Sequence, residues 1–188
     1  PIIRNLVFMG MGEPLLNLRE TTRALEMLNH DKGMDFSPRR ITVSTCGIKA
    51  GLRELGDSGL AFLAVSLHAP NQELRAKIMP KAANWHLDDL MATLESYPLK
   101  TREHITFEYL LLGGVNDQPE HARELGLVVK LHDEPGVDED GTARHGEGVH
   151  AVVQQHVGGE REGLRGEGFG EAVHNGLDVA LDFGVFHK

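Results

Sequence analysis

Several short polar segments in the first 110 residues hold side chains that could bind a small ligand. The first is Gly10-Met11-Gly12-Glu13-Pro14. Its glycines would let a ligand approach the backbone, and the Glu13 carboxylate could accept a hydrogen bond from a cation such as an α-amino group. A dinucleotide fingerprint fails here because Leu15 occupies its third glycine position, and no Gly-Lys-Ser/Thr follows for a phosphate loop. A plain tight turn with a surface glutamate is the alternative interpretation.

Polar residues also follow two apolar runs further along the chain. Ser44 and Thr45 end the first of these runs, and Ser66-Leu67-His68 ends the second. If both runs are parallel strands, their carboxyl ends meet at one edge, so Glu13, Ser44, Ser66 and His68 could line one pocket. Taken singly, the serines and threonine are equally typical of strand ends, and His68 of a hydrogen-bonded loop histidine.

Other candidate groups support no assignment from the sequence alone. Glu108 lies inside an apolar run, where it could face a barrel interior or form a structural ion pair. Arg39-Arg40 could meet phosphate, although two arginines before a strand are usually solvated. Cys46 is the only cysteine, so it can form no internal disulfide and cannot alone hold zinc or an iron–sulfur cluster. We interpret it as a small buried residue. His145 and His150 show no recognisable metal-ligand spacing.

The pattern of apolar residues predicts alternating strands and helices. These elements would bring the candidate polar residues together. The strands are predicted at residues 2–9, 40–45, 60–67 and 105–112. Helices are predicted at 18–29, around 52–55, after a cap at Asn71, at 87–97 and at 119–130. Four strands alternating with helices favour a parallel α/β fold.

The composition changes near residue 131. Residues 1–130 carry 15 Lys/Arg and 16 Asp/Glu, whereas residues 131–188 carry 4 and 12 and therefore most of the net charge of −9. The second segment also holds 12 of the 22 glycines and 6 of the 11 histidines. Its apolar residues are too scattered to predict a helix or strand, and Val149–Val153 is the nearest candidate. We therefore divide the chain into residues 1–130 and an irregular tail at 131–188.

Overall composition indicates a globular chain rather than a disordered or membrane one. Hydrophobic residues make up 40% and charged residues 25%. No apolar run approaches the roughly 18 residues of a spanning helix, and no signal peptide is recognisable at the start. These features predict a cytoplasmic location and no membrane partner.

Four segments of residues 1–130 contain longer motifs, namely Val7–Asn17, Ser37–Thr45, Ala64–Asn71, and Thr106–Tyr109 with Gly114–Asp117. In this order and spacing they resemble the RlmN and Cfr group of radical S-adenosylmethionine methyltransferases. The resemblance implies a partial β/α barrel of about four β/α units, beginning at the second strand of the family's barrel. It also implies that Gly12, Glu13, Ser44, Ser66, Leu67 and His68 contact S-adenosylmethionine.

The chemistry of this group implies two cofactors and a nucleic-acid substrate. A [4Fe–4S] cluster on a Cys-x3-Cys-x2-Cys loop cleaves one S-adenosylmethionine, and a second provides the methyl group for C2 of an adenine. The substrate is 23S ribosomal RNA and, in some members, transfer RNA, and a reductant such as flavodoxin supplies electrons. Cys46 matches none of the group's cysteines, so no catalytic or metal-binding residue is assigned within this chain.

From these observations we expect the chain to be an internal fragment of such an enzyme. We expect it to contribute part of the cofactor pocket and to be inactive alone. The cluster loop is expected before Pro1. We interpret residues from about Leu131 as a shifted reading frame, which translation of the nucleotide sequence in all frames past codon 130 would check. Another radical S-adenosylmethionine enzyme with the same barrel, or a truncated remnant without activity, are the alternatives.

Overall fold

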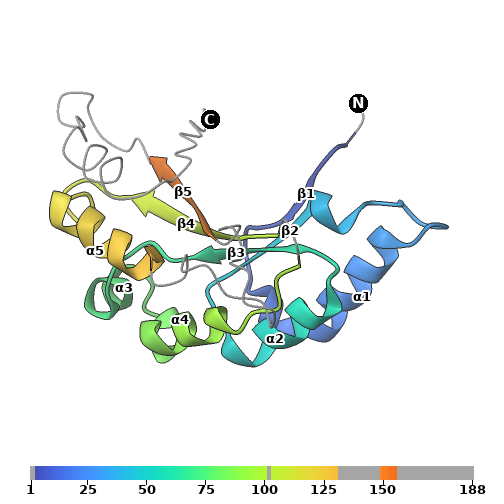
Figure 1. Cartoon of the computed structure of the whole chain (residues 1–188), viewed down its shortest axis with the longest axis horizontal. Helices are drawn as coiled ribbons and strands as arrows, with labels where there is room; N and C mark the ends of the chain where they lie inside the picture. The colour runs from blue at the N-terminus through green and yellow to red at the C-terminus, as the bar shows by residue number, and fades with distance from the viewer. Residues whose placement is uncertain (1–2, 101–102, 131–148, 156–188) are drawn as a thin grey trace, which may run out of the picture. The chain divides into compact units, whose positions relative to one another are not determined.

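A computed structural model describes residues 3–100, 103–130 and 149–155 of the chain (Figure 1). The chain divides into two compact units. The first contains the residues up to Ser66 together with Trp85–Ile105, and the second contains Leu67–Asn84 and the chain from Thr106 onward. No helix among the described residues has the length and apolar character needed to cross a membrane.

Three parallel strands form the sheet of the first unit. They are β1 (Leu6–Phe8), β2 (Ile41–Thr45) and β3 (Phe62–Ser66), which pair in chain order. The three predicted strands are confirmed, although β1 is shorter than the predicted run at residues 2–9. Since parallel neighbours are joined by crossovers, their carboxyl ends lie at the same edge.

Helices cover one face of this sheet. They are α1 (Leu18–Asn29), α2 (Lys49–Ser58) and α4 (Leu87–Glu95), and Figure 1 shows all three on the same side of the strands. Leu25, Leu52 and Leu90 are almost completely buried there. Two short 3₁₀ turns, η1 (Pro14–Asn17) and η2 (Pro38–Arg40), lead into α1 and β2.

The opposite face of β2 is polar. Ile41, Val43 and Thr45 are buried, whereas the alternating residues Thr42 and Ser44 are only half-buried. Because successive side chains of a strand point to opposite faces, the two half-buried residues point away from the helices. The sheet of the first unit therefore has one apolar face and one face with hydroxyl groups at the carboxyl end.

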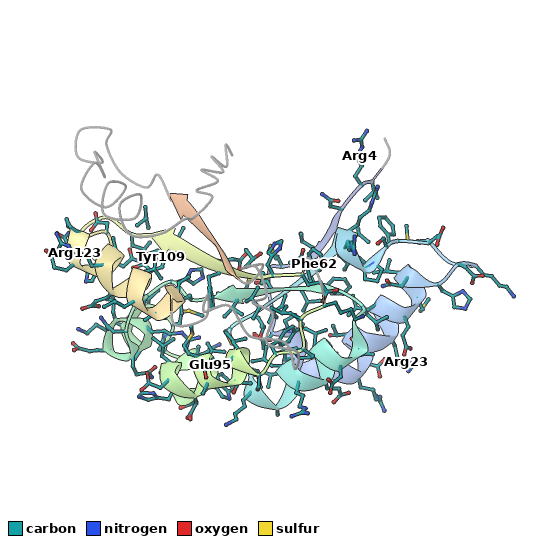
Figure 2. The ribbon with its side chains drawn as sticks, viewed as in Figure 1. Arg4, Arg23, Phe62, Glu95, Tyr109 and Arg123 are labelled. Atoms are coloured by element: carbon teal, nitrogen blue, oxygen red, sulfur yellow. The ribbon has the colours of Figure 1, made fainter. Side chains whose placement is uncertain are left out.

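The second unit contains the remaining helices and strands. They are α3 (Gln72–Ile78), the short 3₁₀ turn η3 (Ala82–Asn84), β4 (Ile105–Leu111), α5 (Pro119–Lys130) and β5 (Val149–Gln155). The predicted cap at Asn71 is confirmed, since its Oδ1 accepts a hydrogen bond from Leu74 N at 2.9 Å. On the helices of both units, charged side chains such as Arg23 and Arg123 form exposed ion pairs with glutamates on the same helix (Figure 2).

The α/β fold class is confirmed, because four strands followed by helices run through residues 3–130. The described part of the tail, residues 149–155, forms the strand β5, which neighbours β4. The sequence assigned no strand to the tail and gave Val149–Val153 as the nearest candidate, and β5 occupies this segment, extended to Gln155. The boundary at residue 131 and the reading-frame hypothesis remain predictions, and the other tail residues lie outside the described ones.

Candidate functional site

The loop after β1 is open to an approaching ligand. Gly10 and Gly12 have φ of +132° and +115°, a backbone conformation that residues with a Cβ rarely adopt. A Cβ added to either glycine would meet no heavy atom within 4 Å. Met11, between them, is fully exposed. The backbone at Gly12 can therefore be reached from outside without moving another side chain.

Glu13 ends this loop, and both oxygens of its carboxylate accept hydrogen bonds. Oε1 accepts from Leu15 N at 3.0 Å and from Thr45 Oγ1 at 2.7 Å, and Oε2 accepts from Cys46 N at 2.8 Å. The side chain thus caps η1 and fastens the loop to the end of β2. A carboxylate has about four acceptor positions, so one on Oε2 remains for a ligand cation. The surface-glutamate interpretation is wrong, because Glu13 is half-buried in this network.

Thr45, which ends β2, is not among the predicted site residues, yet it holds Glu13 in place. Its side chain is 2% exposed, and its hydroxyl donates to Glu13 and accepts from Gly47 N at 3.0 Å. Cys46, expected to be buried, is half-buried. The sequence signal for Thr45 was its position directly after Ser44, on the opposite face of the same strand.

Ser44 and Ser66 meet at the carboxyl ends of neighbouring strands. Their hydroxyl oxygens lie 3.4 Å apart, and either one could donate. The strand register pairs Ser44 with Ala64, so Ser66 lies one pleat further along the same face. The predicted proximity of these two strand ends is therefore confirmed. In the first unit, the hydroxyls of Ser44 and Ser66 and the Glu13 carboxylate, which has one acceptor position left, thus lie at or after the ends of the three parallel strands.

Leu67 and His68 belong to the second unit, where backbone hydrogen bonds hold both to β4. The amides of Leu67 and His68 donate to Glu108 O at 3.0 and 3.2 Å. His68 has φ of +56°, which is unusual for a residue other than glycine. Leu67 is completely buried, so its side chain contributes packing rather than an exposed contact surface.

The imidazole of His68 is fixed as a hydrogen-bond donor. Its Nδ1 accepts from Leu110 N at 3.1 Å, so the proton of the neutral ring is on Nε2. Burial lowers the pKa of His68, the Glu108 carboxylate opposes that shift, and the Arg75 guanidinium adds to it. The ring therefore favours the neutral form with an N–H at Nε2.

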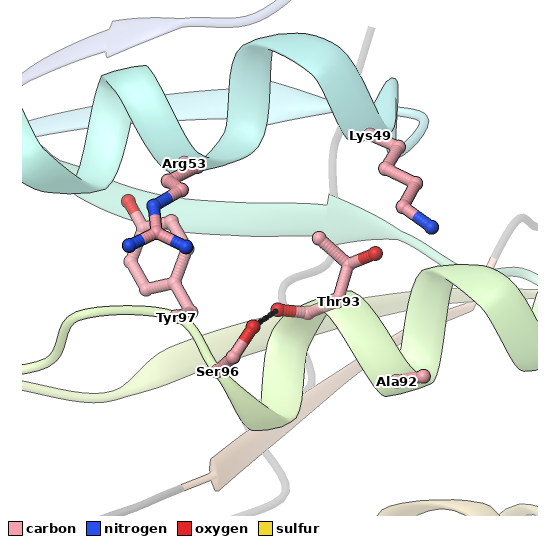
Figure 3. A pocket seen from close by; sticks show the side chains of 6 residues that line it. All are labelled: Lys49, Arg53, Ala92, Thr93, Ser96 and Tyr97. Atoms are coloured by element: carbon pink, nitrogen blue, oxygen red, sulfur yellow. Dashed lines mark hydrogen bonds between the residues drawn. The ribbon is translucent and has the colours of Figure 1, made fainter.

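A second feature of the first unit is a groove of about 300 Å³ on its helical side (Figure 3). It is lined by side chains of α2, α4 and the turn after α4, namely Lys49, Arg53, Ala92, Thr93, Ser96 and Tyr97. Ser96 Oγ donates to the backbone oxygen of Thr93 at 3.1 Å. None of the predicted site residues lines this groove, so it is separate from the strand ends.

Comparison with known proteins identifies the family. The sequence model of the Radical SAM superfamily matches residues 2–126. The chain belongs to this superfamily. The match includes β1 to β4 and all six residues predicted to contact the cofactor.

Curated relatives give a more specific similarity. The chain is 79% identical over 129 residues to the "Dual-specificity RNA methyltransferase RlmN" of Nitratidesulfovibrio vulgaris strain DP4. The matching residues make up 69% of this chain and 35% of the relative. It is 69% identical to the protein of that name from Lawsonia intracellularis, over 69% of this chain and 36% of the relative. The "Ribosomal RNA large subunit methyltransferase N" of Nitrosopumilus maritimus is 46% identical, over 68% and 37%. The chain thus spans about a third of the length of these relatives.

Solved structures agree with the superfamily. A radical SAM methyltransferase from Sphaerobacter thermophilus matches with a TM-score of 0.78 and 30% identity, covering 97% of this chain and 52% of that one. A domain of a pyruvate-formate lyase-activating enzyme from Bacteroides vulgatus has a TM-score of 0.61 at 14% identity, covering 95% and 98%. The second similarity shows only that the fold is shared.

The residues of the first unit fit one of the two cofactors of the superfamily. The open backbone at Gly12, the free acceptor position of Glu13 and the hydroxyls of Ser44 and Ser66 suit an amino acid-like, polar ligand such as S-adenosylmethionine. A [4Fe–4S] cluster does not fit, since Cys46 offers one thiolate where three or four ligands are needed. Among the described residues, no group of three or more His, Cys, Asp or Glu could hold a metal ion.

Proposed function

We propose that this chain is part of a radical S-adenosylmethionine methyltransferase that methylates C2 of adenosine in 23S ribosomal RNA and, as in some members of the group, in transfer RNA. The observation that carries the proposal is the 79% identity over 129 residues to a protein named as an RNA methyltransferase. The superfamily match over residues 2–126 contains Glu13, Ser44, Ser66 and His68. By the same similarity, we expect a cytoplasmic enzyme supplied with electrons by a flavodoxin-type reductant.

The residues of this chain would bind and orient S-adenosylmethionine rather than carry the methyl group. Glu13 would accept a hydrogen bond from the α-amino group through the free position on Oε2. Ser44 and Ser66 would offer hydroxyls from the polar sheet face, and His68 would offer its Nε2–H. When bound, S-adenosylmethionine supplies the methyl group and, with the cluster held outside this chain, the radical.

Glu13 is suited to this work because it is already held in place. Three donors from the chain fix its carboxylate before any ligand arrives. A cation that binds there does not have to order the side chain, so less conformational entropy is lost. An exposed and freely rotating glutamate would lack this advantage.

A segment exchange tests the proposal. The matching 129 residues of the Nitratidesulfovibrio vulgaris relative are replaced by those of this chain, and the hybrid enzyme is reconstituted anaerobically with cluster and reductant. Mass spectrometry of digested 23S ribosomal RNA and transfer RNA then measures 2-methyladenosine. We expect the hybrid to form 2-methyladenosine in each RNA in which the parent enzyme forms it.

The control is the same hybrid carrying Glu13→Ala, which removes the acceptor and is compared only where circular dichroism and cluster content match those of the unaltered hybrid. It should methylate RNA far more slowly at limiting S-adenosylmethionine. A folded, cluster-loaded hybrid that forms no 2-methyladenosine would contradict the proposal.

A further inference from the structure

Asn116 is a buried amide at the centre of the loop that follows β4. It is 0% exposed, and all its side-chain polar atoms have partners in the second unit. Nδ2 donates to His68 O at 2.8 Å and to Leu110 O at 2.7 Å, and Oδ1 accepts from Leu112 N at 2.6 Å. Because carbonyl oxygens only accept and an amide N–H only donates, these partners fix the orientation of the side chain.

The bonds of Asn116 meet those of the imidazole of His68. The amide group holds the carbonyl oxygens of His68 and Leu110, and the backbone N–H of Leu110 in turn donates to Nδ1 of His68. The side chain of Asn116 therefore fixes the backbone of His68 and also that of Leu110, whose N–H sets the tautomer of the His68 ring. His68 N also donates to Glu108 O, so its main chain is held on both sides.

We propose that Asn116 is a positioning residue, which clamps His68 in its left-handed conformation so that the imidazole offers a fixed Nε2–H to bound S-adenosylmethionine. The inference rests on the proposed function, because that function places His68 in the cofactor pocket. A histidine backbone at positive φ is strained and persists only when its surroundings determine it. The Asn116 amide stabilises this conformation, because a change in the backbone of His68 would break the hydrogen bond from Asn116 Nδ2 to His68 O.

Two substitutions separate positioning from general loop stability. Asn116→Asp keeps the acceptor for Leu112 N but replaces the donor to the carbonyl oxygens of His68 and Leu110 with an oxygen. Tyr109→Phe is the matched control, since it removes a different bond of the same loop, from Tyr109 Oη to Asn116 O at 2.9 Å. Both changes should lower the melting temperature, and only Asn116→Asp should alter His68.

Nuclear magnetic resonance of the imidazole nitrogens of the 188-residue chain gives the direct test, with His68→Asn identifying the signal. In the unaltered chain and in Tyr109→Phe, His68 should be a single Nε2–H tautomer at neutral pH, and in Asn116→Asp it should be a tautomer mixture. The side-chain amide protons of Asn116 should also exchange slowly in the unaltered chain. Fast exchange, or a different tautomer in the unaltered chain, overturns the proposal even if Asn116→Asp does not fold.

The hybrid enzyme described above gives the functional arm. Asn116→Asp should raise KM for S-adenosylmethionine about tenfold with little change in kcat, as expected when the hydrogen bond from His68 Nε2–H to the cofactor is lost. Tyr109→Phe should leave KM unchanged. Equal effects of the two variants on KM would overturn a positioning role. An unaltered hybrid without activity would instead contradict the proposed function, while the tautomer measurements still decide whether Asn116 positions His68.

Discussion

Thr45 Oγ1 donates a 2.7 Å hydrogen bond to Glu13 Oε1 and so joins the loop after β1 to the carboxyl end of β2. The two residues are 32 positions apart in the sequence. The same hydroxyl accepts from Gly47 N, so Thr45 serves the turn after its own strand and the loop after the preceding one. A buried threonine thereby fixes the carboxylate that we assign to the cofactor.

The first prediction concerns this threonine. Thr45→Val keeps the shape of the buried side chain but removes the hydroxyl, which leaves Gly47 N without its acceptor and Glu13 with one donor fewer. An unmet buried hydrogen bond costs about 1–3 kcal/mol, and urea unfolding of the chain should show a loss of that size. Thr45→Ser retains the hydroxyl and is the control. If the valine variant is as stable as the unaltered chain, the bond network does not hold the loop.

The second prediction concerns the carboxylate itself. Glu13→Ala removes the acceptor for Leu15 N, Thr45 and Cys46 N, and in the hybrid enzyme it should weaken S-adenosylmethionine binding by roughly 1.5–3 kcal/mol. Glu13→Gln should cost less, since its amide oxygen, placed at the Oε2 position, can still accept from Cys46 N and from the α-amino group, although its NH₂ group then faces Leu15 N and Thr45. Calorimetric titration measures both. An unchanged affinity in the alanine variant would remove Glu13 from the pocket.

The sequence predicted most of the elements because their signals are local. The spacing of Leu18 to Asn29 predicted α1 with its observed bounds, and Asn71 marked the start of α3. β5 could be given only as a candidate at Val149–Val153 because its apolar residues are few, and pairing with β4, a contact distant in sequence, completes it. Periodicity reports burial of a segment but does not report which segment it pairs with.

The candidate site was predicted less completely, for a physical reason. The strand ends predicted that Ser44 and Ser66 lie close together, since parallel topology alone brings such ends to one edge. Asn116 could not be found in this way, because its role depends on a loop folding back to the backbone of His68, 48 residues earlier. Hydrogen bonds between side chain and distant backbone leave no periodic signal.

The third prediction is that the isolated chain cannot assemble a stable [4Fe–4S] cluster. Cys46 is its only cysteine, and one thiolate replaces at most one of the three ligands that the group's loop supplies. Anaerobic reconstitution followed by iron and sulfide analysis should give far less than one cluster per chain. A content of about four irons per chain would show that other residues serve as ligands.

The last prediction is a pH dependence of stability that originates at His68. Burial lowers the pKa of this histidine in the folded chain, with the Arg75 guanidinium adding to the shift and the Glu108 carboxylate opposing it, whereas the unfolded chain titrates near the ordinary value of 6.5. Between these two pKa values the unfolded chain binds more protons, so the free energy of unfolding rises with pH there. The contribution of His68 to the free energy of unfolding should therefore be complete above 6.5 and be lost as the pH falls below that value, by at most about 1.4 kcal/mol per pH unit.

Urea unfolding of the unaltered chain and of His68→Asn at several pH values isolates this contribution from that of the other titrating groups. Asparagine suits the comparison because it adopts positive φ more readily than most residues and does not titrate. The difference in unfolding free energy between the two proteins should change with pH below 6.5 and become constant above it. A difference that is constant across the whole range, or that changes in favour of the unaltered chain on acidification, would mean that His68 takes up a proton at least as readily in the folded chain as in the unfolded one. In that case the imidazole would be a cation at mildly acidic pH, and the neutral Nε2–H donor would not be a fixed property of the fold.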